Sequence, residues 1–142
     1  MDRRRAEEFC RSYGAASIQG DPIGIAGHYG VPFTAFTLGD VSTFNDREDA
    51  TRRVTSHLER FNAVGLGTAI GLQASEIVPV SEQLALCHLT WEIRPADGTP
   101  PWTWTNVYAL REAADARLYF EASFADNEIT GLLERFPEFF TP

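Results

Sequence analysis

The chain has 142 residues, of which 44% are hydrophobic and 23% are charged, and its formal net charge is −8 at pH 7; these values are typical of one globular domain over residues 1–142. The negative charge argues against nucleic acid and anionic membranes as partners, because phosphate-rich surfaces attract basic proteins. No apolar run reaches the length of about 20 residues that crosses a bilayer, so we expect no membrane span.

Residues 1–20 predict an amphipathic helix. Its apolar residues recur at helical spacing: Ala6, Phe9, Cys10, Tyr13 and Ala16. This segment lacks the apolar core of a secretory signal, so we expect a cytoplasmic protein. Cys10 and Cys87 form no CxxC pair, and we expect both to be reduced thiols. Asp21 can cap a short second helix that starts at Pro22 and ends near residue 29.

The stretch FTAFTLGDVSTF, residues 33–44, predicts two short strands joined at Gly39-Asp40. A helix then follows the sequence NDRE, in which Asn45 is the expected N-cap and Glu48 its capping-box partner. The helix places several side chains on one apolar face: Ala50, Val54, His57, Leu58 and Phe61.

The second half of the chain predicts an antiparallel meander and a last helix. Turn-forming residues separate four strands, at about 68–78, 84–94, 102–111 and 117–125. The last helix presents an apolar face and ends at Pro137: Ile129, Leu132, Leu133 and Phe136. Helices on one face of a curved antiparallel sheet make an α+β fold.

One strand, within PPWTWTNVYAL at residues 100–110, carries an unusual set of side chains. Its alternate positions hold two indoles, an amide and a phenol: Trp102, Trp104, Asn106 and Tyr108. Because alternate residues of a strand share a face, one face collects aromatic area together with hydrogen-bonding groups, which is the composition of a small-molecule pocket. The alternative is an aromatic-rich core whose polar atoms are satisfied locally.

Three stretches carry a resemblance to a known family: FCRSYGAASIQGDPIGIAGHYG, FNDREDATRRV and RLYFEASFADNEI. With the order of elements, they resemble the nuclear transport factor 2-like superfamily, which includes SnoaL-like polyketide cyclases and ketosteroid isomerases. The resemblance implies a cone-shaped α+β barrel in which N-terminal helices cover the concave face of the sheet. It also implies a small-molecule ligand in the cavity between them.

Site residues follow from the same resemblance. In the ketosteroid isomerases a tyrosine at the spacing of Tyr13 donates to the developing oxyanion, Tyr29 resembles a supporting tyrosine, and Asn106 falls where those enzymes hold a protonated acid. The isomerase base would fall near Thr37, and no carboxylate lies there, so steroid isomerisation is not expected. We expect the ligand to contact five aromatic residues: Tyr29, Phe33, Trp91, Trp104 and Tyr108.

Glu121 is the remaining candidate, and its role depends on the register of its strand. If Ser123 faces the cavity, Glu121 does too, and an acid there is a candidate general acid or base. In the opposite register the apolar residues face inward and Glu121 is solvated. The first register leaves an apolar stripe on the convex face: Leu118, Phe120, Ala122 and Phe124. We then expect a homodimer through the sheet, which covers that stripe.

Three functional hypotheses remain. The first is an acid–base enzyme of isomerase, cyclase or dehydratase type that needs no cofactor and acts on a small, mostly apolar carbonyl compound, with Tyr13, Asn106 and Glu121 as catalytic candidates. The second is a non-catalytic module that binds a hydrophobic ligand, and the third is a structural dimerisation domain. The histidines show neither HxH nor HExxH spacing, so no metal site is expected.

Overall fold

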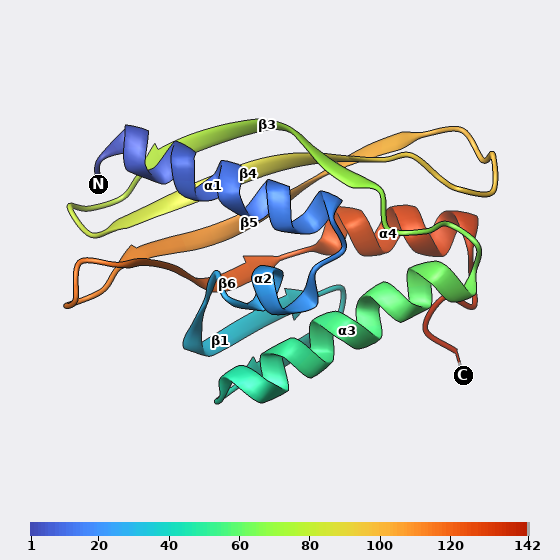
Figure 1. Ribbon diagram of the computed structural model, residues 1–142, viewed down its shortest axis with the longest axis horizontal. Coiled ribbons are helices and arrows are strands. Elements are labelled where there is room, and N and C mark those ends of the chain that lie inside the picture. The colour runs from blue at the N-terminus through green and yellow to red at the C-terminus, as the bar shows by residue number, and fades with distance from the viewer. Residues whose placement is uncertain (142) are drawn as a thin grey trace.

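Four helices and a six-stranded sheet make up the computed structural model, which describes residues 1–141 (Figure 1). The helices are α1 (Arg3–Ile18), α2 (Pro22–Ala26), α3 (Arg47–Ala63) and α4 (Asp126–Arg135). The strands are β1 (Tyr29–Thr37), β2 (Asp40–Phe44), β3 (Ile70–Pro79), β4 (Leu84–Ile93), β5 (Trp102–Glu112) and β6 (Leu118–Phe124). The predicted α+β class and the order of elements are confirmed.

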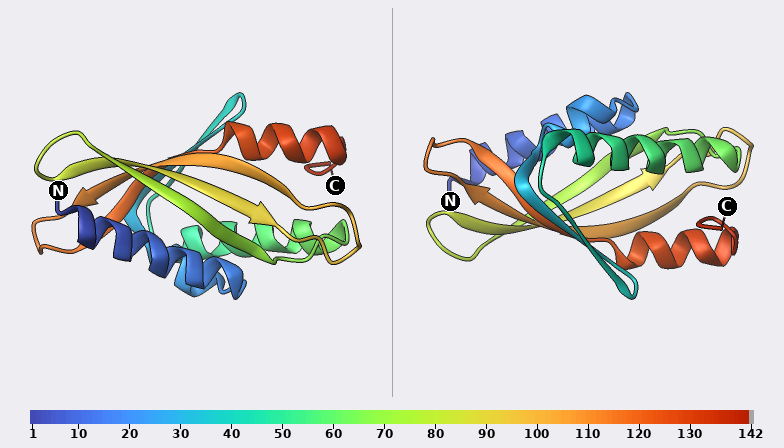
Figure 2. Two further views of the ribbon diagram at one scale, coloured as in Figure 1. Left: turned by 90° about the horizontal axis from the view of Figure 1, so that it is seen from above. Right: turned by 90° about the horizontal axis from the view of Figure 1, so that it is seen from below.

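The sheet is curved and open. Its strand order is β2-β1-β6-β5-β4-β3, so β2 and β3 are the edges and the barrel expected from the sequence does not close. Neighbouring strands are antiparallel except β1 and β6, which are parallel. Figure 2 shows α1, α2 and α3 on one side of this twisted sheet, while α4 follows β6 and packs on β5. No helix within residues 1–141 has the length and hydrophobicity needed to span a lipid bilayer.

Helix α1 begins at a clear cap and packs closely on β3. The side chain of Asp2 accepts hydrogen bonds from the backbone N–H groups of Arg4 and Arg5, which would otherwise lack partners at a helix start. A Cβ atom at Gly14 would lie 2.9 Å from Cβ of Leu72 on β3. Glycine at this position therefore lets the helix approach the sheet.

Helix α3 begins one residue later than predicted. The N-cap is Asp46 rather than Asn45, and its side chain accepts a hydrogen bond from the backbone N–H of Asp49. Either residue type can cap a helix, so the sequence NDRE admits two starting points. At α2, Asp21 occupies the expected N-cap position but its side chain forms no capping hydrogen bond.

Strands β4 and β5 alternate strictly between buried and less buried residues. The inward set on β4 is Ala85, Cys87, Leu89, Trp91 and Ile93, and on β5 it is Trp102, Trp104, Asn106, Tyr108 and Leu110. The predicted inner face of residues 102–108 is therefore correct. Asn106 is the only polar residue of this inward set, with an exposed fraction of 3%.

Strand β6 departs from simple alternation. Ala109 of β5 pairs with Ala122, but the next residue, Leu110, pairs with Phe120, so Glu121 is an extra residue in a β-bulge. The bulge shifts the phase of the strand, which allows Phe120 to be fully buried while Ser123, three residues later, lines the pocket.

Two predictions about this strand are wrong for that reason. Glu121 does not line the pocket, because it forms a bidentate ion pair with Arg111, with Nε donating to Oε2 at 2.6 Å and a terminal nitrogen donating to Oε1 at 3.0 Å. Phe120 is not part of a convex stripe, because its ring packs inward against Phe9, Tyr13 and Tyr108. Both registers considered for the sequence assumed unbroken alternation.

Candidate functional site

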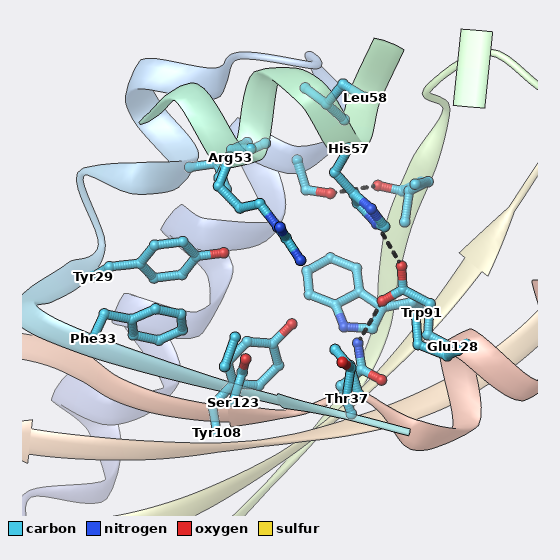
Figure 3. Close-up of a pocket in the computed structure, with 18 of the residues that line it drawn as sticks. Tyr29, Phe33, Thr37, Arg53, His57, Leu58, Trp91, Tyr108, Ser123 and Glu128 are labelled. Carbon is cyan, nitrogen blue, oxygen red and sulfur yellow. Dashed lines mark hydrogen bonds and ion pairs between the residues drawn. The ribbon is translucent and has the colours of Figure 1, made fainter. Parts of the chain in front are cut away.

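A pocket of about 500 Å³ lies between the inner face of the sheet and helices α3 and α4 (Figure 3). Its walls are mainly apolar and aromatic, and all four helices and all six strands contribute residues to it. Polar side chains enter from several elements: a tyrosine cluster from α1, β1 and β5, charged residues from α3, and Glu128 from α4. This combination of apolar walls with a few convergent polar groups is typical of small-molecule sites.

Three phenols form the tyrosine cluster: Tyr13, Tyr29 and Tyr108. The hydroxyl oxygens of Tyr13 and Tyr29 are 2.7 Å apart, and the Tyr13 hydroxyl donates to that of Tyr108 at 3.5 Å. Burial raises the pKa of Tyr108 to about 12 and raises the pKa values of Tyr13 and Tyr29 as well. The phenols therefore remain protonated at neutral pH. Two of their three hydroxyl hydrogens are used within the cluster, and the third is available to a ligand oxygen.

A second polar group links three elements of the fold. The carboxylate of Glu128 on α4 accepts a hydrogen bond from Nδ2 of Asn106 on β5 at 2.9 Å, and its other oxygen lies 2.8 Å from Nε2 of His57 on α3. Figure 3 shows the contact between His57 and Glu128 along one wall of the pocket. Burial of Glu128 raises its pKa, but the hydrogen bond and charge of His57 and the hydrogen bond from Asn106 outweigh burial, so the pKa is lowered.

The ionised carboxylate determines the form of the imidazole. Because a carboxylate only accepts hydrogen bonds, Nε2 of His57 must carry the hydrogen in this contact, and in neutral imidazole Nδ1 is then unprotonated. Nδ1 forms no hydrogen bond within residues 1–141, so it is free to accept a proton. A histidine oriented by a carboxylate is an arrangement that general-base catalysis uses.

Several buried polar atoms of the pocket residues have no partner in the described part of the chain. They are Nε1 of Trp91, Nε1 of Trp104 and Oδ1 of Asn106. Unpaired buried polar atoms cost about 1–3 kcal/mol each, and a ligand or a water molecule in the pocket can supply the missing hydrogen bond. No group of three or more His, Cys, Asp or Glu side chains in residues 1–141 lies close enough together to hold a metal ion.

Most of the site residues predicted from the sequence lie in the pocket wall: Tyr13, Tyr29, Phe33, Trp91, Trp104, Asn106 and Tyr108. Thr37, where the isomerase base would fall, lines the pocket as well. Among the histidines, His57 lines the pocket, whereas His28 does not, and the ring nitrogens of His28 contact the carbonyl of Gly24 and the hydroxyl of Ser12. The structure thus brings the predicted residues together and leaves out Glu121.

Sequence reasoning missed Glu128 and Arg53. Glu128 lies four residues before Leu132 and therefore borders the apolar face of α4, which is an unusual place for a carboxylate and was a usable signal. Arg53 lies next to Val54 on α3 and lines the pocket. It is one of four arginines on that helix, and nothing in the sequence pattern separates it from the others.

Comparison with solved structures shows the same fold in proteins of low sequence identity. An NTF-2-like protein of unknown function from Shewanella oneidensis has a TM-score of 0.68 and 13% identity over 87% of this chain and 98% of its own. A ketosteroid isomerase-like protein from Erwinia carotovora atroseptica has a TM-score of 0.67 and 14% identity over 87% of this chain and 95% of its own. A domain of unknown function with a cystatin-like fold from Nostoc punctiforme has a TM-score of 0.71 and 17% identity over 96% of this chain and 86% of its own.

Sequence comparison assigns the family. No curated protein matches the chain significantly. The family model described as NTF2-like protein (DUF6841) matches residues 3–120, which include every helix and strand except α4 and part of β6. The resemblance seen in the sequence is thereby confirmed, and the chain belongs to the NTF2-like DUF6841 family.

Proposed function

We propose that this protein binds a small, mostly apolar carbonyl compound in the pocket and acts on it by acid–base chemistry without a cofactor. The observation that carries the proposal is the part-buried contact of Glu128 with both His57 and Asn106 inside an aromatic pocket. His57 replaces Glu121 as the candidate base. Tyr13 and Asn106 keep the roles expected of them, as hydrogen-bonding groups for a substrate oxygen.

The proposed chemistry begins with a proton transfer. Nδ1 of His57 takes a proton from the carbon next to the substrate carbonyl, and the electron pair of that C–H bond moves onto the carbonyl oxygen as an enolate. Neutral donors of the pocket, the phenols and the second N–H of Asn106, stabilise the developing negative charge. Glu128 is a positioning residue, since it holds the imidazole in the tautomer that leaves Nδ1 free.

Proton exchange at carbon tests this step without knowledge of the product, because isomerisation, aldol cyclisation and dehydration can all begin with it. The protein would be incubated in D₂O with small cyclic ketones and enones, such as 2-tetralone, and loss of the α-proton signal followed by NMR. We expect exchange above the buffer rate for wild type and a loss of about 10²-fold or more in His57→Gln. His88→Gln, on the face of β4 turned away from the pocket, is the matched control.

The role of Glu128 has a separate spectroscopic test. Glu128→Gln can keep both contacts if its amide oxygen accepts from Asn106 and its amide nitrogen donates to Nε2 of His57. This arrangement moves the imidazole hydrogen to Nδ1, so imidazole ¹⁵N shifts should report the opposite tautomer, and α-proton exchange should fall. An unchanged tautomer in Glu128→Gln would contradict the positioning role.

The alternative functions are a non-catalytic module that holds a hydrophobic ligand and a structural dimerisation domain. Binding of cyclic ketones with no α-proton exchange by wild type would favour the binding module. A cytoplasmic setting remains part of the proposal, because both cysteines are free and buried, as is usual in a reducing compartment.

We also propose a homodimer through the outer face of the sheet, the face turned away from the pocket. The strand register aligns a row of residues across four strands there: Val41, Phe36, Phe124 and Val107. Phe124 is 43% exposed and its ring stacks on that of Phe36 at 4.8 Å, and Val41 is 59% exposed. A second copy related by a twofold axis would cover this apolar row.

A further inference from the structure

Arg53 is a cation of the pocket wall that lacks a counter-charge. Its guanidinium forms no ion pair with any carboxylate of residues 1–141. Its Cζ atom lies 6.0 Å from the ring centroid of Phe44. Figure 3 shows the side chain reaching from α3 into the pocket, toward the space bounded by Tyr29, Tyr108 and the His57–Glu128 pair.

The other arginines at the start of α3 are engaged elsewhere. Arg47 donates to the backbone carbonyl groups of Ala26 and Tyr29 and so ties α3 to α2 and β1. Arg52 pairs with Glu48 and Asp49 on the helix surface and does not line the pocket. Arg53 is therefore the member of this group whose donors are available to a ligand.

The carboxylates of the pocket form no ion pair with Arg53. Glu128 is already bound to His57 and Asn106, and Asp40, the other carboxylate in the wall, forms no ion pair with any residue of the range 1–141. The unpaired N–H groups of Trp91 and Trp104 add two buried donors. Together with Arg53 they give the pocket three unpaired donor side chains, and such donors suit an oxygen-rich, negatively charged group on the ligand.

We infer that the ligand carries a carboxylate that Arg53 binds, while its apolar body lies against the aromatic walls. This inference rests on the proposed function, because it assumes that the pocket binds a small molecule, and it narrows the substrate class from carbonyl compounds in general to anionic ones. The planar guanidinium matches the two oxygens of a carboxylate in a bidentate, charge-assisted contact. Because the overall charge of the protein is negative, pairing with Arg53 would offset the long-range repulsion of an anionic ligand.

Matched probes test the inference. Binding of phenylacetate, cinnamate and 2-naphthylacetate would be measured by isothermal titration calorimetry beside the corresponding carboxamides, which have the same shape and no charge. For wild type we expect at least one carboxylate to bind about tenfold or more tightly than its carboxamide. Arg53→Gln should abolish this preference and change carboxamide binding less than about twofold. Arg53→Lys, which keeps the charge and loses the bidentate geometry, should fall between them.

Arg52→Gln is the control, because it removes a neighbouring positive charge outside the pocket, and it should keep the preference of wild type. Carboxamides that bind wild type as tightly as carboxylates would overturn the inference and leave the proposed function standing. A carboxylate preference that survives in Arg53→Gln would also overturn it. If no probe of either kind binds, the inference and the proposed binding function fail together.

Discussion

Replacement of Glu128 by alanine should destabilise the fold far more than replacement of a surface glutamate. The change removes the acceptor of two hydrogen bonds, from Asn106 and His57. Asn106 is 3% exposed and its Oδ1 is already unpaired, so its amide would be left with no partner among the residues around it. His57 is more accessible, with 34% of its side chain exposed, so water can replace its lost contact.

The magnitude follows from these two environments. A hydrogen bond to a charged group contributes about 1.5–3 kcal/mol, and a buried unpaired amide costs about 1–3 kcal/mol. Because the His57 contact is partly recovered by water, we expect a loss of about 2–4 kcal/mol in the free energy of unfolding. Urea unfolding followed by circular dichroism and tryptophan fluorescence would measure it.

Glu134→Ala is the matched control, because Glu134 lies on the exposed side of the same helix and forms no ion pair within residues 1–141. Its substitution should change stability by no more than about 0.5 kcal/mol. Equal effects of the two substitutions would show that Glu128 does not hold Asn106 and His57, and would refute the reasoning.

Three further predictions follow from the same structure. The pKa of Glu128 is lowered in the folded protein from its usual 4.5. The ionised carboxylate therefore stabilises the fold fully above about pH 4.5, and this stabilisation is lost as the pH falls through the lowered pKa of the folded state. The loss of stability in acid should consequently be smaller in Glu128→Ala than in wild type. Phe124→Asp should convert a dimeric wild type to a monomer in sedimentation experiments, and a monomeric wild type at micromolar concentration would contradict the dimer. Gly14→Ala should lower stability by about 1–3 kcal/mol, because the new Cβ meets Leu72, whereas an unhindered helix would gain about 1 kcal/mol.

The sequence predicted the fold because each level of its pattern agrees with the others. Helical spacing in α1, strict alternation in β4 and β5, and turn residues between strands all indicate the same elements. The aromatic wall was predictable for the same reason, since alternation alone places Trp104, Asn106 and Tyr108 on one face.

The polar centre of the site was harder to predict. In a regular strand, Glu121 and Ser123 share one face, and this is why the sequence predicts Glu121 in the cavity. The bulge at Glu121 breaks that alternation, and no glycine or other local signal in the sequence marks it. The contact between His57 and Glu128 joins residues 71 positions apart, and no local periodicity carries such information. Only the packing of α4 against β5 and α3 brings the carboxylate to the histidine.

The central claim, that the pocket between the sheet and α3 and α4 binds a small molecule, can be tested with the tryptophans of the chain. Trp91 and Trp104 line the pocket and Trp102 does not, although all three lie on the inner face of the sheet. Indole ¹H–¹⁵N NMR spectra would be recorded during titration with 2-tetralone and 2-naphthylacetate, with the signals assigned from single Trp→Phe variants. We expect the indole signals of Trp91 and Trp104 to shift with a common saturation curve while the signal of Trp102 stays in place. Unchanged signals of Trp91 and Trp104, or a shift confined to Trp102, would contradict the claim.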